Sequence, residues 1–163
     1  MRISLTAMAT ATAGILLLTG TAAAAPGTAT PHKGCSQTIH LTTTNGEITQ
    51  VDNGTPGAGI GDLTVITGDL LENGEPAGTL GMTFTKIQQD PNDKTTVGGG
   101  IFKLEGRGQI AFSSMQTFPN DQPPVGIKNA ITGGTDEFRN ARGEVHVVNG
   151  APTGGIYTLN ITC

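Results

Sequence analysis

A glycine-rich segment, residues 130–145, most strongly constrains what this chain can fold into. It runs from an apolar strand end through Gly133-Gly134 to a new strand that begins at Gly143. Glycine adopts a positive φ where a chain turns sharply, and it lets two backbones approach closely. Phe138 lies between these glycines and offers a large apolar side chain as a plug. The segment is therefore typical of the corner of a β-barrel.

The remaining sequence beyond residue 34 also predicts β-structure. Glycine and proline interrupt every long run, and threonine, valine and isoleucine are abundant. Turn sequences such as Asn53-Gly54 separate the runs. The expected strands are residues 37–44, 46–52, 62–71, 77–87, 95–105, 107–116, 125–131, 143–148 and 154–162. Eight or nine strands at this spacing are typical of a sandwich or an up-and-down barrel.

The first 24 residues have the pattern of a secretory signal peptide. Arg2 precedes an apolar run, and Ala22 with Ala24 matches a cleavage site. The run is shorter than the ~20 residues that a membrane span needs, although an uncleaved anchor stays open as the alternative. The pattern predicts an exported, extracellular protein with no membrane contact after cleavage. A flexible leader would cover residues 25–34, and one folded domain would cover residues 35–163.

The charged residues argue against nucleic acid as a partner. The formal net charge is −4, and lysine and arginine are scattered singly along the chain. The histidines, at positions 32, 40 and 146, share no spacing that is typical of metal ligands. We therefore expect neither a metal site nor a cofactor.

Cys35 and Cys163 are the only cysteines, and they stand at the two ends of the expected domain. In an oxidising compartment an even number of cysteines favours a disulfide. The bond requires Cα atoms within roughly 7 Å, so the first and last strands would be neighbours, as in a closed sheet. A reactive thiol and an intermolecular bridge are the alternatives. This reasoning favours a barrel over a sandwich.

Several segments together resemble the allene oxide cyclase and dirigent families. The corner at Gly133 matches their Gly-Gly-(Thr/Ser)-x-x-Phe pattern. Residues 61–65 and 77–83 are similar to the second and third barrel strands of allene oxide cyclases, and residues 102–111 to their central hairpin. The resemblance implies a closed, calycin-like, eight-stranded antiparallel barrel. With the alanine-rich signal peptide and the body rich in glycine and threonine, it suggests a bacterial secreted member whose termini are joined by the predicted disulfide.

Allene oxide cyclases hold an unsaturated epoxide in an apolar cavity and guide its cyclisation, and dirigent proteins steer the coupling of phenoxy radicals. This chain departs from both patterns, because Val65 and Gly68 replace a proline and an asparagine of the cyclases, and Leu41 follows His40 where dirigent proteins have aspartate. True allene oxide cyclisation is therefore not expected.

The resemblance still implies a barrel that binds a small apolar or aromatic molecule in its lumen. Confinement alone can promote cyclisation or coupling. Whether the protein is an enzyme stays open; an enzyme would be isomerase-like, cyclase-like or dirigent-like. The alternative is a ligand carrier, or an interaction module whose barrel is filled. Both families tend to form trimers, which implies a homo-oligomer, either trimer or dimer.

Glu105 is the candidate catalytic carboxylate, because it ends an apolar run beside the turn at Gly106. A solvated Glu105 paired with Arg107 is the alternative. The amides of Gln109 and Asn129 are candidates for bonding a ligand. The sequence does not decide which strand faces line the lumen. The candidate ligand-binding residues are Leu63, Val65, Phe84, Phe102, Gln109, Phe112 and Asn129.

Overall fold

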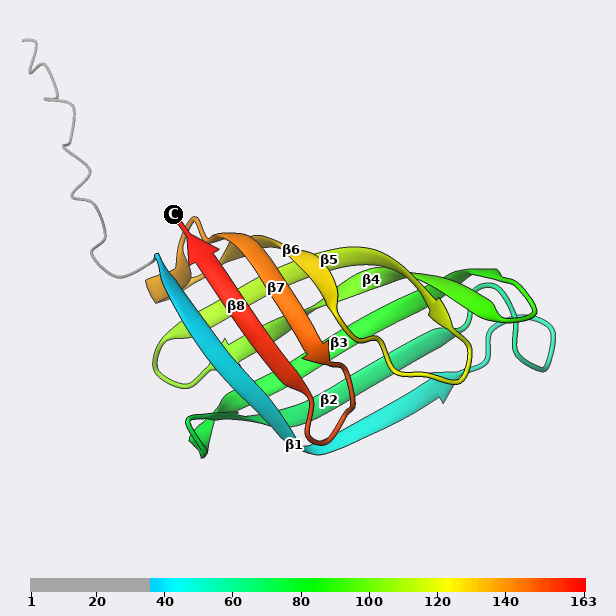
Figure 1. The fold of residues 1–163 in the computed structure, drawn as a ribbon, viewed down its shortest axis with the longest axis horizontal. Helices are drawn as coiled ribbons and strands as arrows, with labels where there is room; N and C mark the ends of the chain where they lie inside the picture. The colour runs from blue at the N-terminus through cyan, green and yellow to red at the C-terminus, as the bar shows by residue number, and fades with distance from the viewer. Residues whose placement is uncertain (1–35) are drawn as a thin grey trace, which may run out of the picture. The chain divides into compact units, whose positions relative to one another are not determined.

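A computed structural model describes residues 36–163, which form eight β-strands and one short 3-10 helix. Each strand pairs antiparallel with the next, and β8 pairs with β1, so the sheet closes into a barrel (Figure 1). The prediction of an all-β, closed, eight-stranded antiparallel barrel is confirmed. The elements are β1 (Gln37–Val51), β2 (Leu63–Glu72), β3 (Glu75–Gln89), β4 (Asp93–Leu104), β5 (Gly108–Pro119), β6 (Ile127–Gly134), η1 (Asp136–Phe138), β7 (Arg142–Asn149) and β8 (Ile156–Thr162).

Some predictions fall outside the described residues. The signal peptide, its cleavage site and the leader lie before residue 36, as does Cys35, so the disulfide also stays a prediction. Within the described part of the chain, no helix is long and apolar enough to cross a membrane.

β1 is one bent strand where the sequence predicted two. Asn45 has a φ of 49°, and the register with β2 shifts between Thr44 and Glu47. A side chain at Gly46 would overlap the backbone carbonyl of Pro152, so the bend requires glycine. Residues 37–42 of β1 pair with β8, and residues 41–44 and 47–51 pair with β2, so the part of β1 after the bend pairs only with β2. The nine predicted strands thus become eight.

The two ends of the barrel differ in how many strands reach them. β2 to β5 pair along most of their length, but β6 meets β5 only between residues 110 and 113 of β5. The later halves of β1 and β5 therefore extend beyond β6, β7 and β8 (Figure 1). At that end the five strands β1 to β5 form a trough, and two loops, residues 120–126 and 150–155, lie at its open side. We call this the open end.

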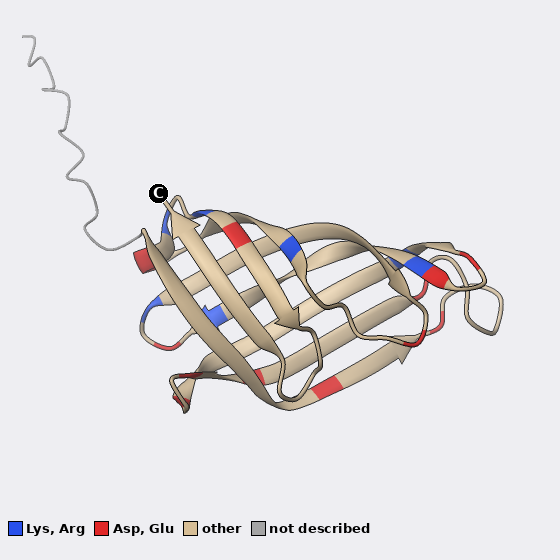
Figure 2. Ribbon diagram, viewed as in Figure 1, with Lys and Arg blue, Asp and Glu red and all other residues tan. Residues whose placement is uncertain are grey.

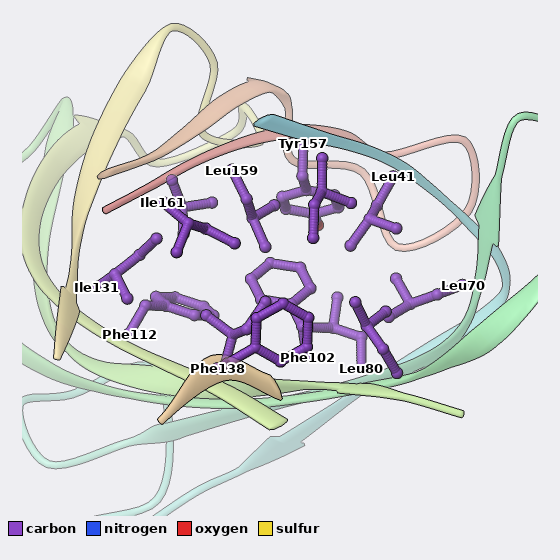
Figure 3. Close-up of a cluster of buried hydrophobic side chains, with 14 of the residues drawn as sticks. Leu41, Leu70, Leu80, Phe102, Phe112, Ile131, Phe138, Tyr157, Leu159 and Ile161 are labelled. Atoms are coloured by element: carbon purple, nitrogen blue, oxygen red, sulfur yellow. The ribbon is translucent and has the colours of Figure 1, made fainter. Parts of the chain in front are cut away.

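The rest of the barrel is filled by apolar side chains (Figure 3). Phe102 lies at the centre, with ring centroids 5.3 Å from Phe112 and 5.5 Å from Tyr157. The buried core residues are Ile39, Leu41, Leu70, Leu80, Met82, Phe102, Leu104, Ile110, Phe112, Ile131, Phe138, Ala141, Val145, Val147, Tyr157, Leu159 and Ile161. These side chains fill this half of the lumen.

The helix η1 closes the end of the barrel opposite the open end. Phe138 is fully buried there, as its position in the glycine corner predicted. The guanidinium of Arg107 lies over its ring, 5.3 Å from the centroid. Arg107 also binds the Glu137 carboxylate through Nε at 2.9 Å and Glu72 through Nη1 at 3.1 Å. The hydrogen bond to Glu137, more than its charge, raises the pKa of Arg107.

Candidate functional site

The trough at the open end contains a cavity of about 420 Å³. Cavities of this size bind small organic molecules in many proteins. Its walls come from the concave face of β1 to β5 and from the two loops. The lining residues are Ile48, Gln50, Thr64, Ile66, Phe84, Lys94, Thr96, Gln116, Phe118, Asn120, Asp121, Gln122, Pro123, Pro124, Gly150, Ala151 and Pro152.

The floor of this cavity is mainly apolar. Ile48 and Ile66 lie directly opposite each other on β1 and β2, and both face the cavity. Phe84 on β3 and Phe118 on β5 add two aromatic rings. Ile48 is 48% exposed although it faces the concave side of the sheet. Its apolar surface is therefore available to a bound molecule.

One wall carries a buried pair of amides. Gln116, which is 8% exposed, lines the cavity from β5, and Asn129 on β6 is 3% exposed. The Gln116 Nε2 donates to Asn129 Oδ1 at 2.9 Å and to Ser114 Oγ at 2.7 Å. These two contacts hold one side of the Gln116 amide in place. The amide can therefore offer its other side to a ligand in a defined position.

Among the described residues, Lys94 is the one cationic side chain in the lining of this cavity. Its Nζ lies 5.0 Å from the centroid of the Phe118 ring and donates to the Asn120 carbonyl at 2.8 Å. Burial lowers the pKa of Lys94, and the charge of Lys86 adds to this effect, while Asp121 acts in the opposite direction. The ammonium is therefore partly removed from water at the edge of an apolar cavity.

A second charged group stabilises the rim beside the cavity. Asp62 accepts hydrogen bonds from the backbone N–H groups of Gly59 at 2.7 Å and Asn53 at 3.2 Å, and Lys86 Nζ lies 3.4 Å away. The bond from Gly59, followed by that from Asn53, lowers the pKa of Asp62. This carboxylate orders the loop between β1 and β2, and Lys86 is engaged with it rather than with the cavity.

The structure brings only some of the predicted site residues to the cavity. Phe84 lines it, and Asn129 reaches it through Gln116. Phe102 and Phe112 belong to the filled core. Glu105 is exposed just after β4, at the far end of that strand from Lys94.

The other candidates lie outside the lumen. Gln109 is exposed on β5. Leu63 and Val65 alternate along β2 with Thr64 and Ile66, which line the cavity, so their side chains lie on the outer face of the barrel. Within residues 36–163 no three His, Cys, Asp or Glu side chains form a cluster that would hold a metal ion.

Sequence reasoning missed Lys94, Gln116 and Phe118. These residues alternate with period two on β4 and β5, where Lys94 pairs with Phe118 and Thr96 with Gln116. That pattern identifies one shared face only when the register between the two strands is known.

Comparison with known proteins adds one informative similarity. No family model matches this chain, and no curated protein does. The resemblance to allene oxide cyclases and dirigent proteins therefore has no support from these two comparisons and stays a hypothesis. Among solved structures, the chain is similar to a pyocyanin demethylase, with a TM-score of 0.67 and 28% identity. The match covers 77% of this chain and 100% of that chain. A barrel of this kind thus occurs in a protein named for its action on a small molecule, which is consistent with small-molecule binding or processing here.

Proposed function

We propose that this protein binds a small, flat, mainly apolar molecule in the cavity at the open end of its barrel. The observation that carries the proposal is the cavity itself, about 420 Å³ with Ile48, Ile66, Phe84 and Phe118 in its lining. A mostly apolar lining with a few placed polar groups is typical of ligand sites. The similarity to a pyocyanin demethylase supports an aromatic ligand, because pyocyanin is a planar aromatic compound.

Binding is the part of the function that the geometry supports best. Cyclisation or coupling by confinement is a finer proposal, since an enclosed apolar wall can hold a flexible molecule in one folded shape. The predicted carboxylate, Glu105, does not line the cavity, so such a reaction would proceed without it. A carrier that only binds is the alternative. The hypothesis of a barrel filled by its own side chains applies only to the half that contains the buried apolar core.

A matched pair of variants tests the site. Ile48→Trp would place a large ring inside the cavity, whereas Thr49→Trp would place it on the opposite face of the same strand. The chain has no tryptophan of its own, so each variant contains one fluorescent reporter. Ile48→Trp should weaken binding of planar aromatic probes, with pyocyanin among them, by about tenfold or more, and Thr49→Trp should not. Equal binding by both variants would place the ligand elsewhere.

We also propose that the protein is exported after cleavage following Ala24, and that Cys35 then bonds Cys163. The pairing of β1 with β8 supports this bond, because Gln37 lies opposite Ile161 in an antiparallel pair. Cys35 comes two residues before Gln37, and Cys163 comes two residues after Ile161. The same register, continued, would set the two cysteines opposite each other. Intact mass spectrometry of the exported protein would show a chain that begins at Ala25 and lacks two thiol hydrogens. A chain with Met1, or with two alkylated cysteines, would contradict the proposal.

A homo-oligomer is the partner arrangement that we propose. The middle parts of β4 and β5 contain no charged residue (Figure 2), and Val97, Ile101 and Met115 on them are 41%, 38% and 70% exposed. Exposed apolar patches commonly mark interfaces. Sedimentation velocity should detect a dimer or trimer at micromolar concentration, and a monomer over the whole accessible range would contradict this arrangement.

A further inference from the structure

We infer that the ligand carries an anionic oxygen, a carboxylate or a phenolate, which binds the ammonium of Lys94. This inference rests on the proposed function, because it takes the cavity at the open end as the ligand site. It adds the chemical class of the molecule that the cavity selects.

The first support is the position of Lys94 in the wall. Lys94 and Phe118 lie opposite each other on β4 and β5, and both line the cavity. The ring beneath Nζ and the Asn120 carbonyl at 2.8 Å hold the ammonium at the cavity edge. A cation over an aromatic face is attracted to it when it is partly desolvated. The charge is therefore placed before any ligand arrives.

The second support is the hydrogen bonding that Lys94 leaves open. A lysine ammonium has three donors, and within the described chain Lys94 uses one, toward Asn120. No carboxylate of residues 36–163 forms a salt bridge with Lys94. Asp62 forms its salt bridge with Lys86. Asp121, which also lines the cavity, is near enough for its charge to raise the pKa of Lys94 against the lowering by burial, but it forms no salt bridge with the ammonium. A partly buried cation with no salt-bridge partner favours an anionic oxygen as its partner.

The third support is the lining around this charge. Phe84 and Phe118 provide aromatic surface for a flat ring. Gln116, opposite Thr96 on the neighbouring strand, donates its N–H groups to Asn129 and Ser114, so its carbonyl oxygen is left to accept from a donor elsewhere on the ligand. A ring between these apolar walls with an acidic oxygen at one edge would contact the aromatic surface and bind the lysine ammonium. An aromatic acid fits the cavity better than a neutral hydrocarbon, which would leave the ammonium without a salt-bridge partner.

Isosteric pairs of probes test the inference. 2-Naphthoate is compared with neutral 2-naphthamide, and 4-nitrophenolate with neutral 4-nitroaniline, by calorimetric titration of the full-length protein. The wild type should bind at least one anion about tenfold more tightly than its neutral partner. The two pairs distinguish a carboxylate from a phenolate. Lys94→Met should abolish the preference. Lys128→Met, a change on the exposed surface where Lys128 contacts Glu144 at 3.3 Å, should keep it.

The failures are distinguishable. Equal affinity for anion and neutral probe would overturn the inference and leave the proposed binding function intact. A preference that survives in Lys94→Met would overturn the assignment to Lys94. If folded wild-type protein, checked by circular dichroism, binds none of the four probes, both the proposed function and this inference fall.

Discussion

The hydroxyl of Tyr157 makes stability depend on alkaline pH in a way that can be calculated. Tyr157 is 1% exposed, lies edge-on to Phe102, and its hydroxyl has no hydrogen-bond partner among the described residues. Ionisation would place a negative charge in an apolar core, so burial raises the pKa of Tyr157 from 10.0 to about 12. It is also the only tyrosine in the chain, so tyrosinate absorbance reports this group alone.

The sign and size follow from linkage. In the unfolded chain Tyr157 loses its proton near pH 10, and in the folded protein it does so near pH 12. The folded state holds the proton of Tyr157 more tightly than the unfolded state does. The contribution of this proton to the free energy of unfolding is therefore fully present below about pH 10 and is lost as the pH rises toward 12. Each unit in this window costs about 1.4 kcal/mol. The free energy of unfolding should therefore be about 1.4 kcal/mol lower at pH 11 through this residue alone.

Tyr157→Phe isolates the effect, because phenylalanine keeps the ring and does not ionise. Urea denaturation of both proteins at pH 8 and pH 11 should show the wild type losing about 1.4 kcal/mol more than the variant. At pH 8 the variant should be at least as stable as the wild type, since the hydroxyl has no hydrogen bond to lose. A tyrosinate midpoint near pH 10, or identical pH dependence of the two proteins, would refute the reasoning.

Phe138→Ala should reduce the free energy of unfolding by about 3–5 kcal/mol, because it removes a fully buried ring at the closed end; a loss below about 1 kcal/mol in denaturant titration would contradict its role as a plug. The contribution of Asp62, whose pKa is lowered chiefly by the Gly59 N–H, is present above about pH 4 and lost as the pH falls through the lower folded value. The Gly59 amide resonance should move over that interval, and should not in Asp62→Asn. Gly46→Ala should cost about 1–3 kcal/mol because its side chain overlaps a backbone carbonyl, whereas Gly81→Ala, with nothing within 4 Å, should be nearly neutral in thermal unfolding.

The barrel was predictable because local turn chemistry marks its strand ends. Asn73 and Gly74 both adopt positive φ, at 54° and 85°, in the turn between β2 and β3, where asparagine and glycine are the expected residues. The glycines on both sides of Phe138 likewise indicate a sharp turn from the sequence alone. The bend in β1 was not predicted, because Asn45 and Gly46 are typical of a turn between two separate strands. The close contact of Gly46 with Pro152 comes from a distant part of the chain.

The cavity was not predictable because it depends on which face of each strand points inward. Residues 63 to 66 are Leu, Thr, Val and Ile, so apolar character does not alternate and the inner face of β2 is not marked. Leu63 and Val65 are apolar although alternation along β2 puts them on the outer face, so hydrophobicity does not distinguish the two faces of this strand. Lys94 looks like an ordinary surface lysine until strand pairing sets it beside Phe118.

Crystallographic screening of flat aromatic fragments tests the central claim most directly. The account predicts an open cavity with fragments gathered between the side chains of Phe84, Phe118 and Lys94, and acidic fragments placing an oxygen beside the lysine Nζ. A lumen closed by side chains at this end, or fragments that bind only outside it, would contradict the account.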